Sequence, residues 1–186
     1  MEFREAAKAV LKEVGRTLDR VDPAAVEHLV QLLVQAKTVF VAGAGRSGLM
    51  IRGFAMRLAH LGRSVQVVGD VTTRGIGRGD VLLVASGSGE TRGILAMAQS
   101  AIEHGAKVGL ITIFPDSSLA RLAERRVVIP APTPKSGRDN PETSIQPMGS
   151  LFEQTLLVTL DVMAMMLMEK FGQTSEQMFK LHANLE

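Results

Sequence analysis

The sequence predicts an α/β protein, a three-layer sandwich in which helices cover both faces of a five-stranded parallel sheet. Short apolar runs alternate with helical patterns along most of the 186 residues. Two of these runs, 38–42 and 81–85, end in turns rich in glycine and serine, and each turn opens a helix. Ligands of such sheets bind at the carboxyl ends of the strands, where the strand order reverses, so both turns should meet at one site.

The composition is typical of one globular domain. Hydrophobic residues make up 46% of the chain and charged residues 22%, with a net charge of +2 and no cysteine. The small net charge predicts neither a nucleic-acid nor a membrane partner. The absence of cysteine excludes disulfides and thiolate chemistry. Because residues 1–5 are charged and lack an apolar signal core, we expect a cytoplasmic protein.

Two helices should precede the first strand. Apolar residues share one face from residue 2 to about residue 20. Asp22 and Pro23 then provide an N-cap and a proline at the first position of a second helix. A minimal nucleotide-binding fold does not need these helices, so we expect them to cover the sheet or to form part of a subunit contact.

Strands and helices should then alternate. The predicted strands are 38–42, 64–68, 81–85, 107–113 and 126–130. Helices should follow the turns at 43–48 and 86–91, and Asp116-Ser117 should cap a short helix through Ala123. The segment 130–149 contains five prolines, and a loop of this length is usually functional or disordered.

A long helix should follow, beginning at 149–154. It is apolar nearly all round from Leu156 to Met168, but Asp161 interrupts it and its apolar stretches are too short for a membrane span. We therefore expect it to be buried in the core or between subunits. A short helix at 175–181 should precede the C-terminal residues.

Both turns carry groups that bind phosphate. Glycines let the backbone approach a ligand, and the first N–H groups of a helix form an anion site together with the helix dipole. Serine and threonine hydroxyls add donors for phosphate oxygens. The candidate binding residues are Gly45, Arg46, Ser47, Ser86, Gly87, Ser88, Gly89, Glu90 and Thr91. For the second turn alone, hydroxyls that only cap the following helix are an alternative.

The first turn also fits a dinucleotide-binding pattern. Residues 43–48 read Gly-Ala-Gly-Arg-Ser-Gly, and Asp70 could bind a ribose. This alternative explains none of Ser47, Ser86 and Ser88, whereas a phosphate held between both turns explains all three. The Walker pattern fails because no Gly-Lys-Ser/Thr occurs in the sequence.

The two turns resemble those of the sugar isomerase (SIS) domain family, which binds phosphosugars. The resemblance covers nearly the whole chain and implies a single SIS domain, 1–186, with a flavodoxin-like fold. The motifs at 69–73, 149–154 and 182–186 are also similar to those of the 6-phospho-3-hexuloisomerases. Those enzymes interconvert 3-hexulose 6-phosphate and fructose 6-phosphate in the ribulose monophosphate route of formaldehyde fixation. Arg74 stands where this resemblance leads us to expect proline.

Such a reaction needs an acid–base group that moves a carbon-bound proton. Glu153 is the first candidate, because it lies in the first turn of the long helix and matches the catalytic glutamate that the resemblance implies. The alternative is a capping box with Ser150.

His182 is the second candidate, since histidine can pass protons between sugar oxygens. The resemblance implies that its tail covers an active site, its own or a neighbouring subunit's; the alternative is a solvent-exposed tail.

Three function classes remain open. The first is the isomerase, the second a non-catalytic phosphosugar sensor, and the third a nicotinamide oxidoreductase that uses the glycine pattern.

We expect no cofactor and no metal site, because His28, His60 and His104 lack ligand-spaced partners. The expected partner is a phosphorylated sugar. The extra helices and the resemblance imply a homo-oligomer, a dimer of dimers. Asp70, Thr72 and the segment 130–149 have no assigned role.

Overall fold

The computed structural model describes residues 2–133 and 143–185 and confirms the predicted fold class. Its centre is a five-stranded sheet in the order β2-β1-β3-β4-β5, in which every neighbouring pair is parallel. The strands are β1 (Val39–Gly43), β2 (Val65–Val67), β3 (Val81–Ala85), β4 (Lys107–Thr112) and β5 (Arg125–Val128). The chain runs from β1 outward to β2 and then returns to the other side of β1, so the order reverses between β1 and β3.

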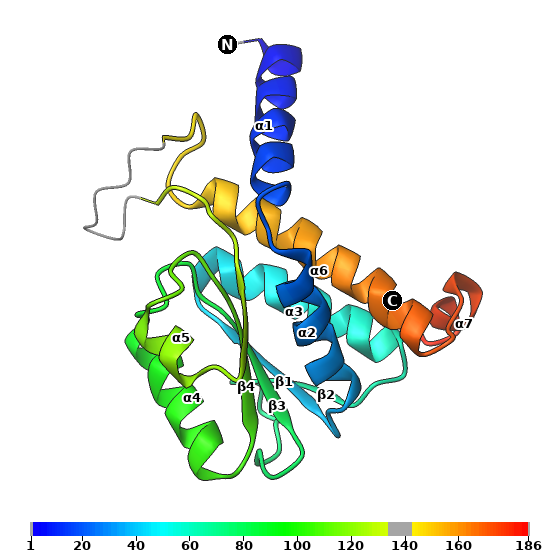
Figure 1. Ribbon diagram of the computed structural model, residues 1–186. Helices are drawn as coiled ribbons and strands as arrows, with labels where there is room; N and C mark the ends of the chain where they lie inside the picture. The colour runs from blue at the N-terminus through cyan, green and yellow to red at the C-terminus, as the bar shows by residue number, and fades with distance from the viewer. Residues whose placement is uncertain (1, 134–142, 186) are drawn as a thin grey trace.

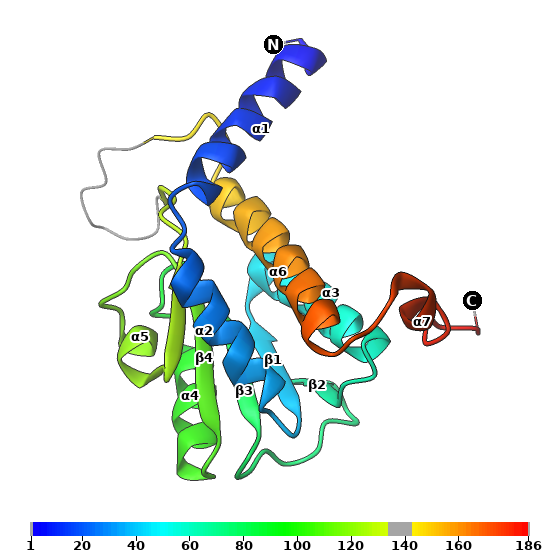
Figure 2. The ribbon, with the colours of Figure 1, turned by 45° about the vertical axis from the view of Figure 1, so that its right-hand side comes forward.

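Helices cover both faces of this sheet (Figure 1). One face carries α2 (Pro23–Val34), α3 (Gly45–His60) and α6 (Ser150–Lys170), and the other carries α4 (Arg92–Glu103) and α5 (Ser118–Leu122). Figure 2 shows that α1 (Phe3–Leu18) extends beyond the sheet from the start of α6, whereas α7 (Ser175–Phe179) lies at the other end of α6.

Burial on both faces explains why the strands are continuously apolar. All residues of β3 are buried. Leu82 and Val84 belong to the core under α4, whereas Leu83 and Ala85 belong to the core under α3 and α6. A strand with helices on both sides cannot alternate between apolar and polar residues without burying polar groups.

The helix starts agree with the expected caps at two positions. The Asp22 carboxylate accepts a hydrogen bond from the Ala24 N–H at 2.9 Å, with Pro23 at the first helical position. Ser117 caps α5 through the Ala120 N–H at 3.3 Å. Both contacts confirm the reading of these residues as N-caps.

The first glycine turn is shorter than expected, because α3 already begins at Gly45. The reason is the close packing of the first helical turn on the end of β1. A Cβ atom on Gly48 would lie 2.6 Å from the Gly43 carbonyl oxygen, so only glycine allows this approach. Arg46 and Ser47 consequently lie on a helix rather than in a loop.

Helix α6 is a core helix along one side. It has the length and hydropathy of a membrane span, and half of that stretch is buried inside the protein. It packs against α1, α2 and α3. Its other side exposes four apolar side chains, those of Leu157, Val158, Val162 and Met165.

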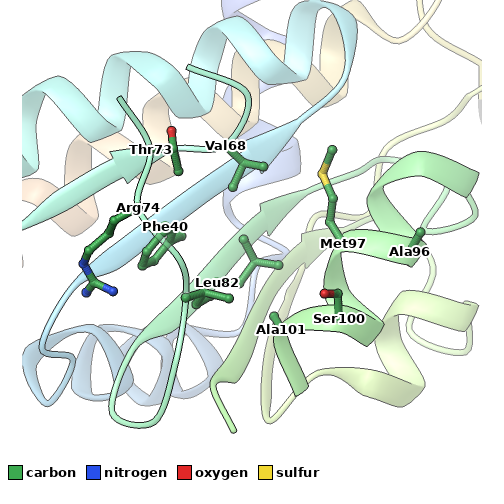
Figure 3. A pocket seen from close by; sticks show the side chains of 10 residues that line it. Phe40, Val68, Thr73, Arg74, Leu82, Ala96, Met97, Ser100 and Ala101 are labelled. Carbon is green, nitrogen blue, oxygen red and sulfur yellow. The ribbon is translucent and has the colours of Figure 1, made fainter. Parts of the chain in front are cut away.

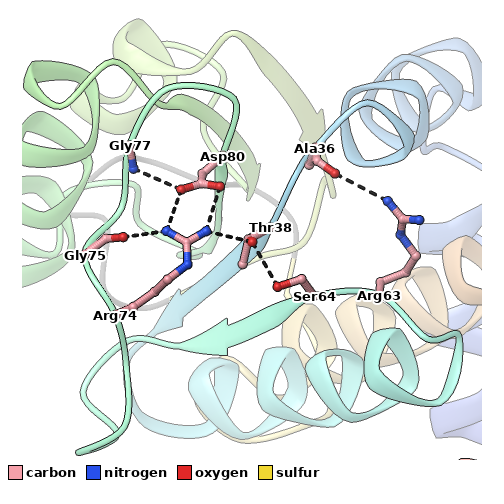
Figure 4. Close-up of polar contacts among 8 residues, drawn as sticks. All are labelled: Ala36, Thr38, Arg63, Ser64, Arg74, Gly75, Gly77 and Asp80. Carbon is pink, nitrogen blue, oxygen red and sulfur yellow. Dashed lines mark hydrogen bonds and ion pairs between the residues drawn. The ribbon is translucent and has the colours of Figure 1, made fainter.

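An ion pair holds the connection between β2 and β3 (Figure 4). Arg74 donates to both carboxylate oxygens of Asp80, at 3.0 and 2.9 Å, and to the Thr38 hydroxyl at 2.7 Å. Asp80 is only 4% exposed. Burial raises the pKa of its carboxyl group, but hydrogen bonds from Arg74 and the Gly77 N–H outweigh burial and lower the pKa below its ordinary value. The arginine that replaces the expected proline therefore has a structural role in this connection.

Candidate active site

A hollow of about 230 Å³ lies at the carboxyl ends of β1 and β3. This is the point where the strand order reverses, the usual ligand position in such sheets. Five parts of the chain form it: the first turn of α3, the turn after β3, Ile113 directly after β4, Thr133 and the start of α6. The lining residues are Ala44, Gly45, Arg46, Ser47, Ala85, Ser86, Gly87, Ser88, Thr91, Ile113, Thr133, Gly149, Phe152 and Glu153.

Beside the start of α6, the N-termini of α3 and α4 border this hollow. Their N-cap residues, Ala44 and Thr91, make no side-chain cap hydrogen bond. The first N–H groups of both helices are thus not satisfied by a side-chain cap, and the positive ends of both helix dipoles are at the hollow. This arrangement suits an anion such as a phosphate.

The hydroxyls of the turn after β3 organise the turn itself. Ser86 is buried, and its hydroxyl oxygen accepts a hydrogen bond from the Gly89 N–H at 3.2 Å and lies 3.2 Å from the Thr91 hydroxyl. Ser88 accepts from the Glu90 N–H at 3.2 Å. The alternative that these hydroxyls only cap α4 is therefore wrong. They hold the turn in a shape that faces the hollow.

Two of the predicted binding residues do not line the hollow. Gly89 is buried with a φ of 64°, and a Cβ atom there would collide with the Ser117 side chain. The Glu90 carboxylate accepts a hydrogen bond from the Ser118 N–H at 2.8 Å. Gly89 and Glu90 thus join the turn to α5, and we place them among the supporting residues.

Glu153 faces the hollow from the first turn of α6. Its Oε2 atom lies 3.2 Å from Nη1 of Arg46, and the same nitrogen donates to the Ser150 hydroxyl at 2.9 Å. The N-cap of α6 is Gly149 and has no side-chain cap. The alternative for Glu153, a capping box with Ser150, is consequently absent, because both side chains bind Arg46 instead.

His182 does not line this hollow. Its ring stacks on His60 with 5.3 Å between centroids and lies 6.0 Å from the Phe179 ring. These side chains border a different hollow, near the end of α6 that is remote from Glu153. Because α6 has 21 residues, its two ends are about 30 Å apart. The tail as far as Leu185, where the described residues end, does not reach that chain's own candidate site.

His60 is a packing residue and is 7% exposed. Burial lowers the pKa of its imidazole, and the positive charges of His182 and Arg57 lower it further. Asp70, the ribose-binding candidate of the dinucleotide alternative, pairs with Arg52 at 3.0 Å and is not part of the candidate site.

Another hollow, of about 380 Å³, lies on the face of the sheet that α4 covers (Figure 3). Its floor is Phe40 and Leu82, and α4 forms one wall. The lining is mainly apolar. The polar groups of Thr73 and Arg74 already bind the Val67 carbonyl and Asp80. We therefore do not place a phosphorylated substrate there.

Some lining residues were not singled out in the sequence. Thr133 follows the fifth strand without any motif that marks it, whereas Phe152 lies inside the motif at 149–154 but was not interpreted as a site residue. Residues 134–142 of the segment 130–149 lie outside the described residues. Among the residues that the structure does describe, no three or more histidines and carboxylates gather as metal ligands would.

A doubly wound parallel sheet with two helix N-termini at its switch point defines a class of α/β proteins that bind anionic ligands at this edge. The family model of the SIS domain matches residues 32–160 of the chain. The chain belongs to the SIS domain family, as the two turns predicted.

Relatives of known name are similar over nearly the full length. The 3-hexulose-6-phosphate isomerase of Bacillus subtilis (strain 168) is 39% identical over all of both chains. The 3-hexulose-6-phosphate isomerase of Mycobacterium gastri is 46% identical over 95% of this chain and 88% of its own.

Solved structures agree with this relationship. The crystal structure of a hypothetical protein superimposes with a TM-score of 0.87 and 34% identity, over 96% of this chain and 95% of its own. A hypothetical protein from Methanococcus jannaschii, whose crystal structure infers a function of 3-hexulose-6-phosphate isomerase, superimposes with a TM-score of 0.84. It is 28% identical over 98% of this chain and 99% of its own.

Proposed function

We propose that the chain is a 6-phospho-3-hexuloisomerase, which interconverts D-arabino-3-hexulose 6-phosphate and fructose 6-phosphate through an enediol. The observation that carries this proposal is the position of Glu153, a carboxylate beside a phosphate-type cradle. The names of the Bacillus subtilis and Mycobacterium gastri relatives support the choice of substrate. The physiological setting would be the ribulose monophosphate route, which the resemblance to the 6-phospho-3-hexuloisomerases implies.

The phosphate of the substrate would bind between the two helix N-termini. The hydroxyls of Ser47, Ser86 and Ser88 and the N–H groups of both turns surround that position. Such contacts recognise the phosphate rather than the reacting carbons, so they hold the substrate without taking part in the proton transfer. The sugar then extends toward the start of α6.

Glu153 would act as the base. It removes the proton from C2 of the 3-hexulose while O3 gains a proton, which gives the 2,3-enediol. Return of a proton to C3 and loss of the proton on O2 then produce the carbonyl at C2 of fructose 6-phosphate. Arg46, which binds Glu153 and Ser150, orients the carboxylate and places a positive charge near the oxygen that becomes negative.

We further propose that the whole of 1–186 forms a single SIS domain, that the protein is cytoplasmic, and that it is a dimer of dimers. The exposed apolar side chains of α6 support the assembly, since they would be covered by a second subunit. In such an assembly His182 could serve a neighbouring subunit's site, where it would move protons between sugar oxygens.

The experiment is NMR of fructose 6-phosphate incubated with the protein in D2O. Deuterium at C3 of fructose 6-phosphate, together with the appearance of the 3-hexulose 6-phosphate, is the expected result. Deuterium at C1 would instead indicate an aldose–ketose isomerase. If fructose 6-phosphate binds but neither exchanges nor isomerises, the sensor alternative is correct.

A further inference from the structure

The segment that leads into α6 is tied to α1 by one carboxylate. Glu13 accepts hydrogen bonds from the Ser144 hydroxyl at 2.8 Å, the Ile145 N–H at 2.9 Å and the Gln146 side-chain amide at 3.0 Å. The Gln146 N–H also donates to the Ser144 hydroxyl oxygen at 3.0 Å. We term these four residues the Glu13 clasp. The clasp joins residues more than 130 positions apart in the sequence.

The clasp favours the ionised form of Glu13. Partial burial raises the pKa of this carboxyl group, but the hydrogen bonds from Ile145, Gln146 and Ser144 outweigh burial and lower the pKa below its ordinary value of 4.5. All three contacts are donors to the carboxylate, so the clasp is complete at neutral pH. An amide in place of the carboxylate would put an NH2 group against these donors.

The clasp is followed at once by a strained turn and then by the candidate site. Met148 has a φ of 57°, in the left-handed region, and its side chain is 67% exposed, so packing of that side chain does not hold the backbone. A strained residue of this kind persists only where its surroundings over-determine it. On the C-terminal side of Met148, the start of α6 restrains the backbone, since the Ser150 N–H donates to the Pro147 carbonyl. On the N-terminal side, the clasp restrains it.

We propose that Glu13 is a positioning residue for the isomerase reaction. Through the clasp, Glu13 fixes the path of the chain just before α6. It thereby fixes the positions of Gly149 and Glu153 at the hollow. Figures 1 and 2 both show α1 meeting the first turns of α6, and the two helices are in contact. Glu13 itself lines a different hollow, with Arg16 and Leu151, so it has no contact with the substrate position. This inference rests on the proposed function.

The first test compares Glu13→Gln with Glu5→Gln, which removes the same charge from the exposed first turn of the same helix. Glu13→Gln should lower kcat by about tenfold or more, because ångström-scale misplacement of a reacting group can cost up to about 10²-fold. KM for fructose 6-phosphate should change by less than about twofold, since the phosphate contacts lie on other loops. Glu5→Gln should match the wild type in both constants.

The second test removes the clasp from its other side. Gln146→Ala should lower kcat in the same way, and the double variant with Glu13→Gln should lose about as much as the worse single variant, because both act through one contact. If the two losses multiply, the residues act independently and the proposal is wrong. Should Glu13→Gln fail to fold, Gln146→Ala and Ser144→Ala test the proposal without it. If these two variants have a lower melting temperature but an unchanged kcat, the clasp has a purely structural role and the proposal is wrong.

The two proposals fail in different ways. If the wild type shows neither isomer formation nor proton exchange, the proposed function fails and the role of Glu13 fails with it. If the wild type is active and Glu13→Gln has the kcat of Glu5→Gln, the function stands and only the inference about Glu13 is overturned.

Discussion

Arg46 and Glu153 are 107 positions apart in the sequence, yet the guanidinium Nη1 of Arg46 lies 3.2 Å from the carboxylate Oε2 of Glu153. The contact joins the first turn of α3 to the first turn of α6 at the hollow. Arg46 is about half exposed, so the pair adds little to the stability of the fold. Its importance is geometric, because it aims the proposed base at the place where the sugar would lie.

Glu153→Gln should abolish most of the turnover and leave binding intact. Glutamine keeps the shape of the side chain and can accept the hydrogen bond from Arg46, but it cannot take a carbon-bound proton. Isomerisation should fall by at least the roughly 10²–10⁴-fold that an acid–base group supplies. Turnover and fructose 6-phosphate affinity are measured on the same protein, with Glu169→Gln at the far end of α6 as the control. Surviving activity would mean that the base lies elsewhere.

His182→Ala should also affect turnover more than binding, because its proposed work is proton transfer among oxygens. Since His182 is remote from its own chain's hollow, mixed oligomers give a sharper test. Reassembly of His182→Ala subunits with Glu153→Gln subunits should restore activity wherever an intact glutamate meets an intact tail. No recovery in verified mixed oligomers would exclude a role across subunits.

Ser47→Ala and Ser88→Ala should each weaken fructose 6-phosphate binding by about 1.5–3 kcal/mol, the usual value of a hydrogen bond to a charged group. Ser86→Ala should do at least as much, because Ser86 also holds Gly89 and Thr91 in place. Calorimetry provides the affinities. Ser100→Ala, in the apolar hollow on the other face, is the control. Equal affinities in all four variants would contradict the phosphate cradle.

Asp80→Asn should destabilise the protein at neutral pH, since the buried carboxylate is the partner of Arg74. We expect a melting temperature lower by about 5 °C or more. The control is Asp70→Asn, which breaks an exposed pair with Arg52 and should have little effect.

The same variant has a defined pH dependence. The folded pKa of Asp80 is lowered, so its stabilising contribution is complete above the ordinary value of 3.8 and is lost as the pH falls through the folded pKa. The difference in unfolding free energy between the wild type and Asp80→Asn should therefore shrink below about pH 3.8 in urea titrations. A constant difference down to pH 2 would contradict this account.

The exposed apolar side of α6 predicts an oligomer. Val162 and Met165 are 45% and 65% exposed, which is unusual for apolar residues of a helix core. Light scattering should show a tetramer for the wild type and smaller species for Met165→Lys. Ile102→Lys, on the opposite face of the sheet, should stay tetrameric. A monomeric wild type at micromolar concentration would refute the assembly.

The sequence by itself determined the layered α/β class, the positions of the five strands, the two turns and the family. These features depend on local periodicity and on short motifs, which act within about ten residues. A strand buried on both faces, such as 81–85, must be apolar on both, and Asp22-Pro23 favours a helix start through an N-cap and a proline whose φ already suits the helix.

Tertiary structure decided the relationships between distant residues. The sequence did not show that Arg46 binds Glu153, that Arg74 pairs with the buried Asp80, or that Glu13 holds residues 144–146. It also predicted substrate contacts for Gly89 and Glu90, which the fold turns toward α5 instead. Partners at such separations are chosen by the packing of whole helices on the sheet, and no local pattern encodes which side chains that packing brings together.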